Sequence, residues 1–261
     1  MDESIVPIAG GNCYGILTHA AQPAADRTTL VLLNAGLTHR IGPFRSSVHI
    51  ARKVAEQGHD VFRFDIPRVG DGAADGRQSL EQCIRSAFDS ITRVTGSRRF
   101  AIGGICSGAD TGWRIAHQDP RVVGVWLFDG FATRGKWFKF GRMRRALRRP
   151  PWQWPGLALR MAQGRTDGLG GVQVSRDWSS PAQFREEAAT LLGRGVRILA
   201  TYTGGIPKYL IHPNQIDDTF GQPRGRDGLD IEFWPDLDHI LLSTLDRDRV
   251  VERVATWFSG F

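Results

Sequence analysis

One stretch near the middle of the chain constrains its fold more than any other. Residues 99–110 read RFAIGGICSGAD, a short apolar run that ends in two glycines and is followed by residues that can form a helix. This is the pattern small–x–nucleophile–x–small, at which a buried strand turns directly into a helix. The turn strains the backbone of its central residue and is tolerated when the flanking residues two positions away lack bulk. The stretch therefore predicts a sharp strand–turn–helix unit with a reactive side chain at its tip.

The glycine spacing selects the central residue of this turn. When the turn is centred on Cys106, the flanking residues are Gly104 and Gly108. When it is centred on Ser107, the residue two positions before is Ile105, which would clash. We therefore interpret Cys106 as the candidate nucleophile and Ser107 as the donor of a backbone N–H. The alternative is a glycine-rich turn that holds an inert buried thiol.

Length and cysteine content bound the class of protein. A chain of 261 residues suits one large domain, or one domain with an insertion. No apolar run reaches the roughly 18 residues of a membrane span, and the first residues lack signal-peptide features. The cysteines Cys13, Cys83 and Cys106 are odd in number and lack metal-site spacing, which favours neither a disulfide framework nor zinc. We expect a cytoplasmic protein, whose reducing compartment keeps a thiol usable.

Apolar periodicity divides most of the chain into alternating strands and helices. Strands are predicted at 5–8, 14–19, 28–33, 60–65, 100–102, 122–128, 196–202 and 229–234, a hairpin turn at 10–12, and helices at 46–57, 79–95 and 244–258. Strands that alternate with helices indicate an α/β fold with a mostly parallel, doubly wound sheet. Such sheets bind ligands beyond the carboxyl ends of their strands, and the candidate residues of the central turn lie at such an end.

The segment 131–180 interrupts this alternation and is predicted to be a helical cap inserted between core segments 1–130 and 181–261. Its first half carries eight basic residues and no acidic residue, and Trp137, Phe140, Met143 and Leu147 fall on one helical face. One interpretation is a lid whose apolar side covers the site. The other is a docking surface for an anionic partner, such as an acyl-carrier protein, a CoA phosphate or an anionic membrane. The net charge of +7 agrees with anionic partners, but nucleic acid is not expected because no binding module accompanies the charge.

A histidine near the end of the chain is the candidate general base. His239 follows the last predicted strand and precedes the last predicted helix. A nucleophile that attacks an acyl group needs an imidazole to accept its proton and return it to the leaving group. The neighbouring Asp238 is interpreted as a turn or cap residue, because adjacent side chains diverge.

A tetrahedral intermediate needs two N–H donors that are already in place. The backbone N–H of Ser107, at a helix N-terminus, is the first predicted donor. The second is expected in the loop after strand 28–33, where Leu37 is the first choice and Gly36 the second. The alternative for this loop is a plain strand-end turn.

The acidic partner of the histidine has no obvious position. The loop after strand 196–202 contains no carboxylate until Asp217. Asp129, directly after strand 122–128, can reach the same side of the sheet and is the first candidate. The alternatives are Asp217 or Asp218, or a site without any acid. A site without an acid is workable because a thiol needs less assistance than a hydroxyl to act as a nucleophile.

Three further residues are candidates for substrate binding. His39 and Arg40, together with Arg45, form a polar cluster beside the predicted donor loop, where they could bind a carboxylate or a phosphate of the substrate. The preferred alternative is structural, with the nearby Arg45 paired to Asp65 or Asp71. Trp137 of the cap is the third candidate.

The chain resembles the α/β-hydrolases over nearly its whole length. The runs 33–45 (LNAGLTHRIGPFR) and 62–71 (FRFDIPRVGD) are similar to hydrolases associated with exosortase systems and to their relatives near acyl-assembly genes. The turn at Cys106 resembles the members with a cysteine nucleophile, such as dienelactone hydrolases. The order of nucleophile first and histidine last is that of the family. The chain departs from it in having no aspartate directly after the penultimate strand.

The resemblance implies an α/β-hydrolase fold and acyl chemistry. We therefore expect a thioesterase or acyltransferase that acts on carrier- or CoA-bound acyl groups through an acyl-Cys106 intermediate. The first alternative is a small-ester or lactone hydrolase, and the second is a non-catalytic binding protein on a hydrolase fold. No cofactor and no metal are expected, because residues 103–108 lack the middle glycine of a dinucleotide-binding motif and no ligand cluster is evident.

Overall fold

The computed structural model describes most of the chain. The described residues are 2–8, 13–23, 27–72, 79–148, 150, 152, 154, 179–204, 210–222 and 225–261, without the side chains of 145 and 146. The predicted hairpin turn at 10–12 and most of the second half of the predicted insertion lie outside them.

A single sheet of eight strands runs through the described residues, in the order β1-β2-β4-β3-β5-β6-β7-β8. The strands are β1 (Glu3–Ile8), β2 (Cys13–Thr18), β3 (Thr28–Leu32), β4 (Val61–Phe64), β5 (Arg99–Ile105), β6 (Val122–Phe128), β7 (Arg197–Thr203) and β8 (Leu229–Trp234). Strand β2 pairs antiparallel with both β1 and β4, and the remaining pairs are parallel. The carboxyl ends of β3 to β8 therefore meet at one edge of the sheet.

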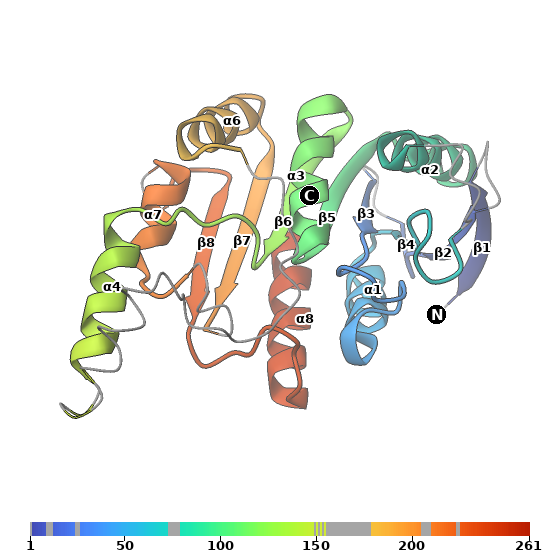
Figure 1. The fold of residues 1–261 in the computed structure, drawn as a ribbon. Helices are drawn as coiled ribbons and strands as arrows, with labels where there is room; N and C mark the ends of the chain where they lie inside the picture. Colours follow the sequence, from blue (N-terminus) through green and yellow to red (C-terminus); the bar gives the residue numbers. More distant parts are fainter. Residues whose placement is uncertain are drawn as a thin grey trace.

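Helices cover both faces of the sheet (Figure 1). One face is covered by α1 (Ser46–Glu56) and α8 (Thr244–Phe258), and the other by α2 (Leu80–Thr95), α3 (Ser107–Gln118) and α6 (Pro181–Gly193). Every residue of β3 and β4 is buried, as expected of strands that lie between two helical layers. The layers place the core on both sides of β5, whose end carries the sharp turn.

The predicted strands and helices are present with ends shifted by one or two residues, except that the central strand, predicted at 100–102, extends over 99–105. Two helices were not predicted from the sequence, namely α6 (Pro181–Gly193) and the short α7 (Asn214–Phe220). The seven residues of α7 are too few for a periodic signal. The described part of the insertion contains α4 (Lys136–Leu147), which packs against α7 at the β8 end of the sheet (Figure 1). Phe140, Met143 and Leu147 of α4 are 42%, 54% and 61% exposed, so they do not form the packed inner side of a lid.

Candidate active site

The turn between β5 and α3 has the strained geometry that the sequence predicts. Cys106 has φ 58° and ψ −115°, a conformation that side-chain-bearing residues rarely adopt. A Cβ at Gly104 would lie 2.8 Å from the carbonyl oxygen of Leu33, and one at Gly108 would lie 2.9 Å from that of Asn34. Both glycines are therefore needed for the turn to fit against the end of β3, and Cys106 stands at its tip, partly exposed.

His239 and Asp129 come together beside this turn. Nδ1 of His239 lies 2.7 Å from Oδ2 of Asp129, although the two residues are 110 positions apart in the chain. The same imidazole is also hydrogen-bonded to the side chain of Cys106. The structure therefore aligns a thiol, an imidazole and a carboxylate in series, which is the arrangement of a nucleophile, a base and an orienting acid.

The surroundings of His239 favour its charged form. Burial lowers the pKa of His239, but hydrogen bonds and charge interactions with Asp129 and Cys106 outweigh burial and raise the pKa to about 9. An imidazolium at neutral pH is a proton donor held next to the thiol, and it stabilises a thiolate there. This is the charge state from which a thiolate can attack and the leaving group can be protonated.

Asp129 is fully buried and supported by the end of β7. Oδ1 of Asp129 accepts a hydrogen bond from the Thr203 N–H at 2.7 Å, and Oδ2 accepts one from the Thr203 hydroxyl at 2.7 Å. Thr203 was not predicted as a site residue from the sequence. The signal that could have indicated its role is a hydroxyl at the strand end where an acid was expected.

The other acidic candidates lie elsewhere. Asp217 and Asp218 are on α7, and Asp218 approaches the segment before α4 rather than His239. Asp238 accepts hydrogen bonds from the N–H groups of Ile240 and Leu242 at 2.7 and 2.8 Å. This confirms the interpretation of Asp238 as a turn residue.

The loop after β3 places one predicted donor directly at the turn. The Gly36 N–H donates a hydrogen bond of 2.8 Å to the side-chain hydroxyl of Ser107. Leu37, the first choice from the sequence, has a side chain that is 87% exposed. The Gly36 N–H therefore lies at the turn, where it is occupied by the Ser107 hydroxyl in this structure. The role of Leu37 as a backbone donor stays a prediction.

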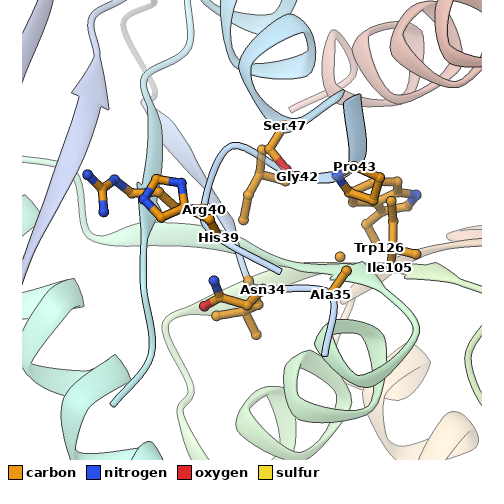
Figure 2. A pocket seen from close by; sticks show the side chains of 12 residues that line it. Asn34, Ala35, His39, Arg40, Gly42, Pro43, Ser47, Ile105 and Trp126 are labelled. Carbon is orange, nitrogen blue, oxygen red and sulfur yellow. The ribbon is translucent and has the colours of Figure 1, made fainter. Parts of the chain in front are cut away.

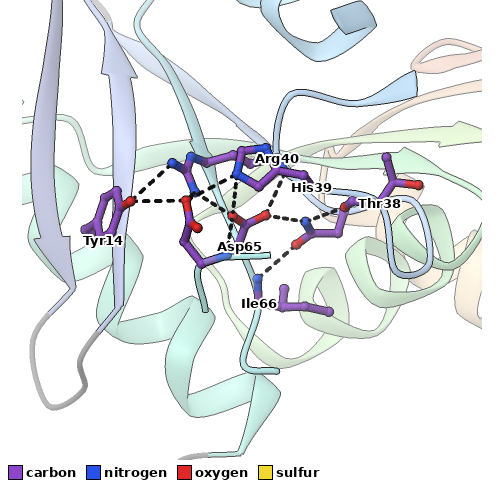
Figure 3. Close-up of polar contacts among 8 residues, drawn as sticks. Tyr14, Thr38, His39, Arg40, Asp65 and Ile66 are labelled. Carbon is purple, nitrogen blue, oxygen red and sulfur yellow. Dashed lines mark hydrogen bonds and ion pairs between the residues drawn. The ribbon is translucent and has the colours of Figure 1, made fainter. Parts of the chain in front are cut away.

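A buried polar network holds this loop against the end of β4 (Figure 3). Asp65 accepts hydrogen bonds from the side chain of Asn34 at 2.8 Å and from the Arg40 N–H at 2.6 Å. The guanidinium of Arg40 lies 2.5 Å from Asp65 and 2.8 Å from Asp71. Asn34 also accepts a hydrogen bond from the Ile66 N–H. The loop is therefore more than a plain strand-end turn, because its first residue is fixed by side-chain contacts.

This network bears on the substrate-binding candidates His39 and Arg40. Nε2 of His39 lies 3.2 Å from Asp65 and 3.3 Å from Asp71, and Arg40 is committed to the same two carboxylates. These contacts favour the structural alternative for both residues. The arginine that pairs with Asp65 and Asp71 is Arg40 and not Arg45, contrary to the sequence-based interpretation.

Among the described residues, one group of side chains has a spacing that could hold a metal ion. It consists of His39, Asp65 and Asp71. The Arg40 guanidinium already bridges the two carboxylates. A cation at this position would face a fixed positive charge, so the arrangement suits an ion pair better than a metal.

A small pocket lies behind the loop (Figure 2). Its lining includes Asn34, Ala35, Pro43 and Trp126, and its volume of about 10 Å³ has room for about one water molecule. Cys106 is not among the lining residues. The pocket is therefore too small to receive a substrate.

Trp137 lies on α4 and stacks on His212, with ring centroids 4.8 Å apart and planes inclined by 14°. His212 directly precedes α7, so this contact joins the insertion to the core. A packing role accounts for the position of Trp137. Figure 1 shows α4 and the turn before α3 at separate places along the sheet.

Comparisons with solved structures identify the fold. The chain is similar to a dienelactone hydrolase from Anabaena variabilis (TM-score 0.60, 13% identity, 100% of this chain and 98% of that chain). It is also similar to the esterase domain of a Rhodothermus marinus protein (TM-score 0.57, 15% identity, 99% and 98%). A proline iminopeptidase from Mycobacterium smegmatis matches with a TM-score of 0.56 at 15% identity (99% and 98%).

The chain therefore has an α/β-hydrolase fold, with an eight-stranded, mostly parallel sheet between helices. No family model matches the sequence, and a search of curated proteins found no match. The comparisons give no support for the particular resemblance to exosortase-associated hydrolases, nor for cysteine as the nucleophile. Within the described part of the chain, no helix has the length and apolar character needed to cross a bilayer.

Proposed function

We propose that the protein hydrolyses activated carboxylic esters, with Cys106 as nucleophile, His239 as acid and base, and Asp129 as the orienting acid. The observation that carries the proposal is the aligned series of Cys106, His239 and Asp129 at the end of β5, with 2.7 Å between the imidazole and the carboxylate. The α/β-hydrolase fold, which an esterase domain and a dienelactone hydrolase share, supports ester hydrolysis.

The reaction proceeds in two stages. The Cys106 thiolate attacks the carbonyl carbon, and the negative charge that develops on the carbonyl oxygen is stabilised by the Ser107 N–H and by the Gly36 N–H once it leaves the Ser107 hydroxyl. The tetrahedral intermediate expels the leaving-group oxygen, which takes the proton of the His239 imidazolium. A water molecule then gives a proton to neutral His239 and attacks the acyl group. Loss of the acid restores the thiolate and the imidazolium.

A thiol nucleophile restricts the leaving group. The tetrahedral intermediate can expel either the Cys106 thiolate or the leaving group of the substrate. A thiol has a pKa near 8.5, so an ordinary alkoxide is expelled far less readily than the thiolate. Enolates and phenolates are expelled more readily, so we infer that the substrates are enol or aryl esters and lactones.

The test is an acylation experiment. The protein is incubated with p-nitrophenyl butyrate, quenched in acid, and analysed by intact mass and peptide mapping. We expect a butyryl adduct on Cys106, none in Cys106→Ala, and an undiminished adduct in the control Cys13→Ala, whose thiol is buried on β2. An adduct that persists in Cys106→Ala, or a wild-type protein that releases no p-nitrophenol, would contradict the proposal.

Thioesters are the second candidate substrate class, because a thiolate is also a good leaving group. The observation that favours them is the exposed basic surface of α4, where Lys139, Arg142 and Arg144 could contact an anionic carrier or a CoA phosphate. The thioester hypothesis predicts a higher kcat/KM for butyryl-CoA than for p-nitrophenyl butyrate. It also predicts that Lys139→Gln lowers kcat/KM for butyryl-CoA and leaves that for p-nitrophenyl butyrate unchanged. If both results are found, the thioester hypothesis replaces the ester hypothesis. Fold similarity to esterases supports the ester reading ahead of this one.

A non-catalytic binding protein is the remaining alternative from the sequence. This alternative depends on a site that lacks an acid, because no carboxylate directly follows β7 in the sequence. The position of Asp129 beside His239 supplies a carboxylate and removes that motivation.

A further inference from the structure

A second hollow lies away from Cys106, between the N-terminal strands and α1. It has a volume of about 370 Å³ and opens to solvent. Its floor is formed by Ile5, Ile16 and Arg63, which are in register on β1, β2 and β4. Its walls include Val48 and Arg52 of α1. None of the proposed catalytic side chains lines it.

Arginines surround this hollow with little compensating charge. Arg45 and Arg52 are exposed, and within the described ranges neither has an ion pair with a carboxylate. Arg63 is 3% exposed and bonds to Glu3 at 2.9 Å, while its Nε has no hydrogen-bond partner among the described residues. Glu3 also accepts a hydrogen bond from the Thr18 hydroxyl. Among the described residues, Arg63 therefore has one carboxylate partner, Glu3, and the charges of Arg45 and Arg52 are not balanced by an ion pair.

The electrostatic environment of Arg63 reflects this imbalance. Burial lowers the pKa of Arg63, and the charges of Arg52, Arg40 and Arg45 lower it further against the opposing effect of Glu3. Arg40 is neutralised by Asp65 and Asp71, so the excess charge resides on Arg45, Arg52 and Arg63. Bringing an anion between these groups would relieve their mutual repulsion.

The shape of the charged groups and of the floor indicates the kind of anion. Guanidinium groups bind phosphate through paired N–H donors and are weakly hydrated, so a dianion is a better match than a single carboxylate. Beside them, Ile5 and Ile41 are 68% and 40% exposed and offer an apolar surface. We propose that this hollow binds a phosphate monoester, with the phosphate between Arg45, Arg52 and Arg63 and an apolar substituent against Ile5 and Ile41.

The proposal is tested by calorimetric titration with phenyl phosphate, inorganic phosphate and phenol at low salt. We expect phenyl phosphate to bind more tightly than inorganic phosphate, and phenol not to bind. In Arg45→Gln and Arg52→Gln the Kd for phenyl phosphate should rise about 10-fold each, as loss of one charged hydrogen-bonding group predicts. In the matched control Arg85→Gln, which removes an exposed arginine of α2 that does not line the hollow, the Kd should not change.

Several results would overturn the proposal. They are no binding of either phosphate compound, equal weakening in Arg85→Gln, or unchanged binding in Arg52→Gln with a wild-type melting temperature. Phosphatidic acid vesicles provide a further arm. If they bind through the same arginines while soluble phenyl phosphate does not, the site recognises a lipid surface and the small-molecule proposal is wrong.

Discussion

Two buried aspartates, Asp65 and Asp129, occupy equivalent places in this fold but have different partners. Each directly follows a parallel strand, β4 or β6, and their exposed fractions are 1% and 0%. Asp65 is paired with Arg40 and with the side chain of Asn34. Asp129 is paired with His239 and with Thr203.

The difference shows how a partner determines what a buried carboxylate can do. Arginine remains protonated at every physiological pH, so the pair of Asp65 and Arg40 cannot exchange a proton and serves to fix the loop that carries Gly36. The pKa of His239 is raised to about 9 but stays far below that of an arginine, so the pair of Asp129 and His239 can take part in proton transfer. The predictions below test this division between a structural and a chemical carboxylate.

The largest effect is expected from Asp129→Asn. The amide keeps the shape of the side chain but removes the charge that orients and stabilises the imidazolium. We expect kcat/KM for p-nitrophenyl butyrate to fall about 100- to 10,000-fold, the range typical of general acid–base assistance. Steady-state kinetics with a melting curve provide the measurement. If activity falls by less than threefold in a folded variant, Asp129 is not the acid.

Arg40→Met is expected to lower the stability of the fold, whereas Asp129→Asn is expected to lower the activity. This change leaves Asp65 buried without its cation, which costs about 3–5 kcal/mol in the free energy of unfolding. The exposed neighbour Arg45 provides the control Arg45→Met, for which we expect little change. Urea denaturation gives the comparison, and equal stability of the two variants would show that Arg40 does not hold the loop.

The pH dependence of the reaction should identify His239. Because its pKa is raised from 6.5 to about 9, the imidazolium stabilises the folded protein fully below pH 6.5, and this contribution is lost as the pH rises through about 9. We expect kcat/KM to decline above about pH 9 and the free energy of unfolding to decrease over the same interval. In Asp129→Asn both declines should move to lower pH. If neither pH profile moves in Asp129→Asn, the pKa of His239 does not depend on Asp129.

A smaller effect is expected from Thr203→Val. The variant loses the hydroxyl that donates to Asp129 but retains the backbone N–H that donates to the same carboxylate. Loss of a hydrogen bond to a charged group costs about 1.5–3 kcal/mol, so we expect roughly a 10- to 150-fold decrease in kcat with little change in KM. Thr203→Ser should restore most of the activity. Failure of this rescue would indicate that packing, and not the hydroxyl, matters.

The smallest effect is expected from Ser107→Ala. The change removes the acceptor that holds the Gly36 N–H and frees this donor for the oxyanion. One neutral hydrogen bond corresponds to about 0.5–1.5 kcal/mol, so kcat should rise about 2- to 10-fold. A decrease of more than 10-fold would instead show that the Ser107 hydroxyl itself donates to the oxyanion.

Local patterns were sufficient to predict the elements that position the site. The turn at Cys106 follows from the glycines two positions before and after it, because a Cβ at either glycine would lie too close to the carbonyl oxygens of the segment that follows β3. The strand positions follow from continuous apolar runs. In contrast, the helix α7 and the pairing of Arg40 were not predicted, because short segments and long side chains leave no periodic signal.

The sequence by itself determined the strand–turn–helix unit and the order of the strands along the chain. Only the tertiary structure decided which carboxylate reaches His239, because β6 and the loop after β8 are far apart in the chain and meet across the end of β7. It also decided that Thr203 supports that carboxylate and that Arg40 neutralises the other. The physical reason is that backbone conformation depends on neighbouring residues, whereas the partner of a buried charge depends on how the strands are ordered in the sheet.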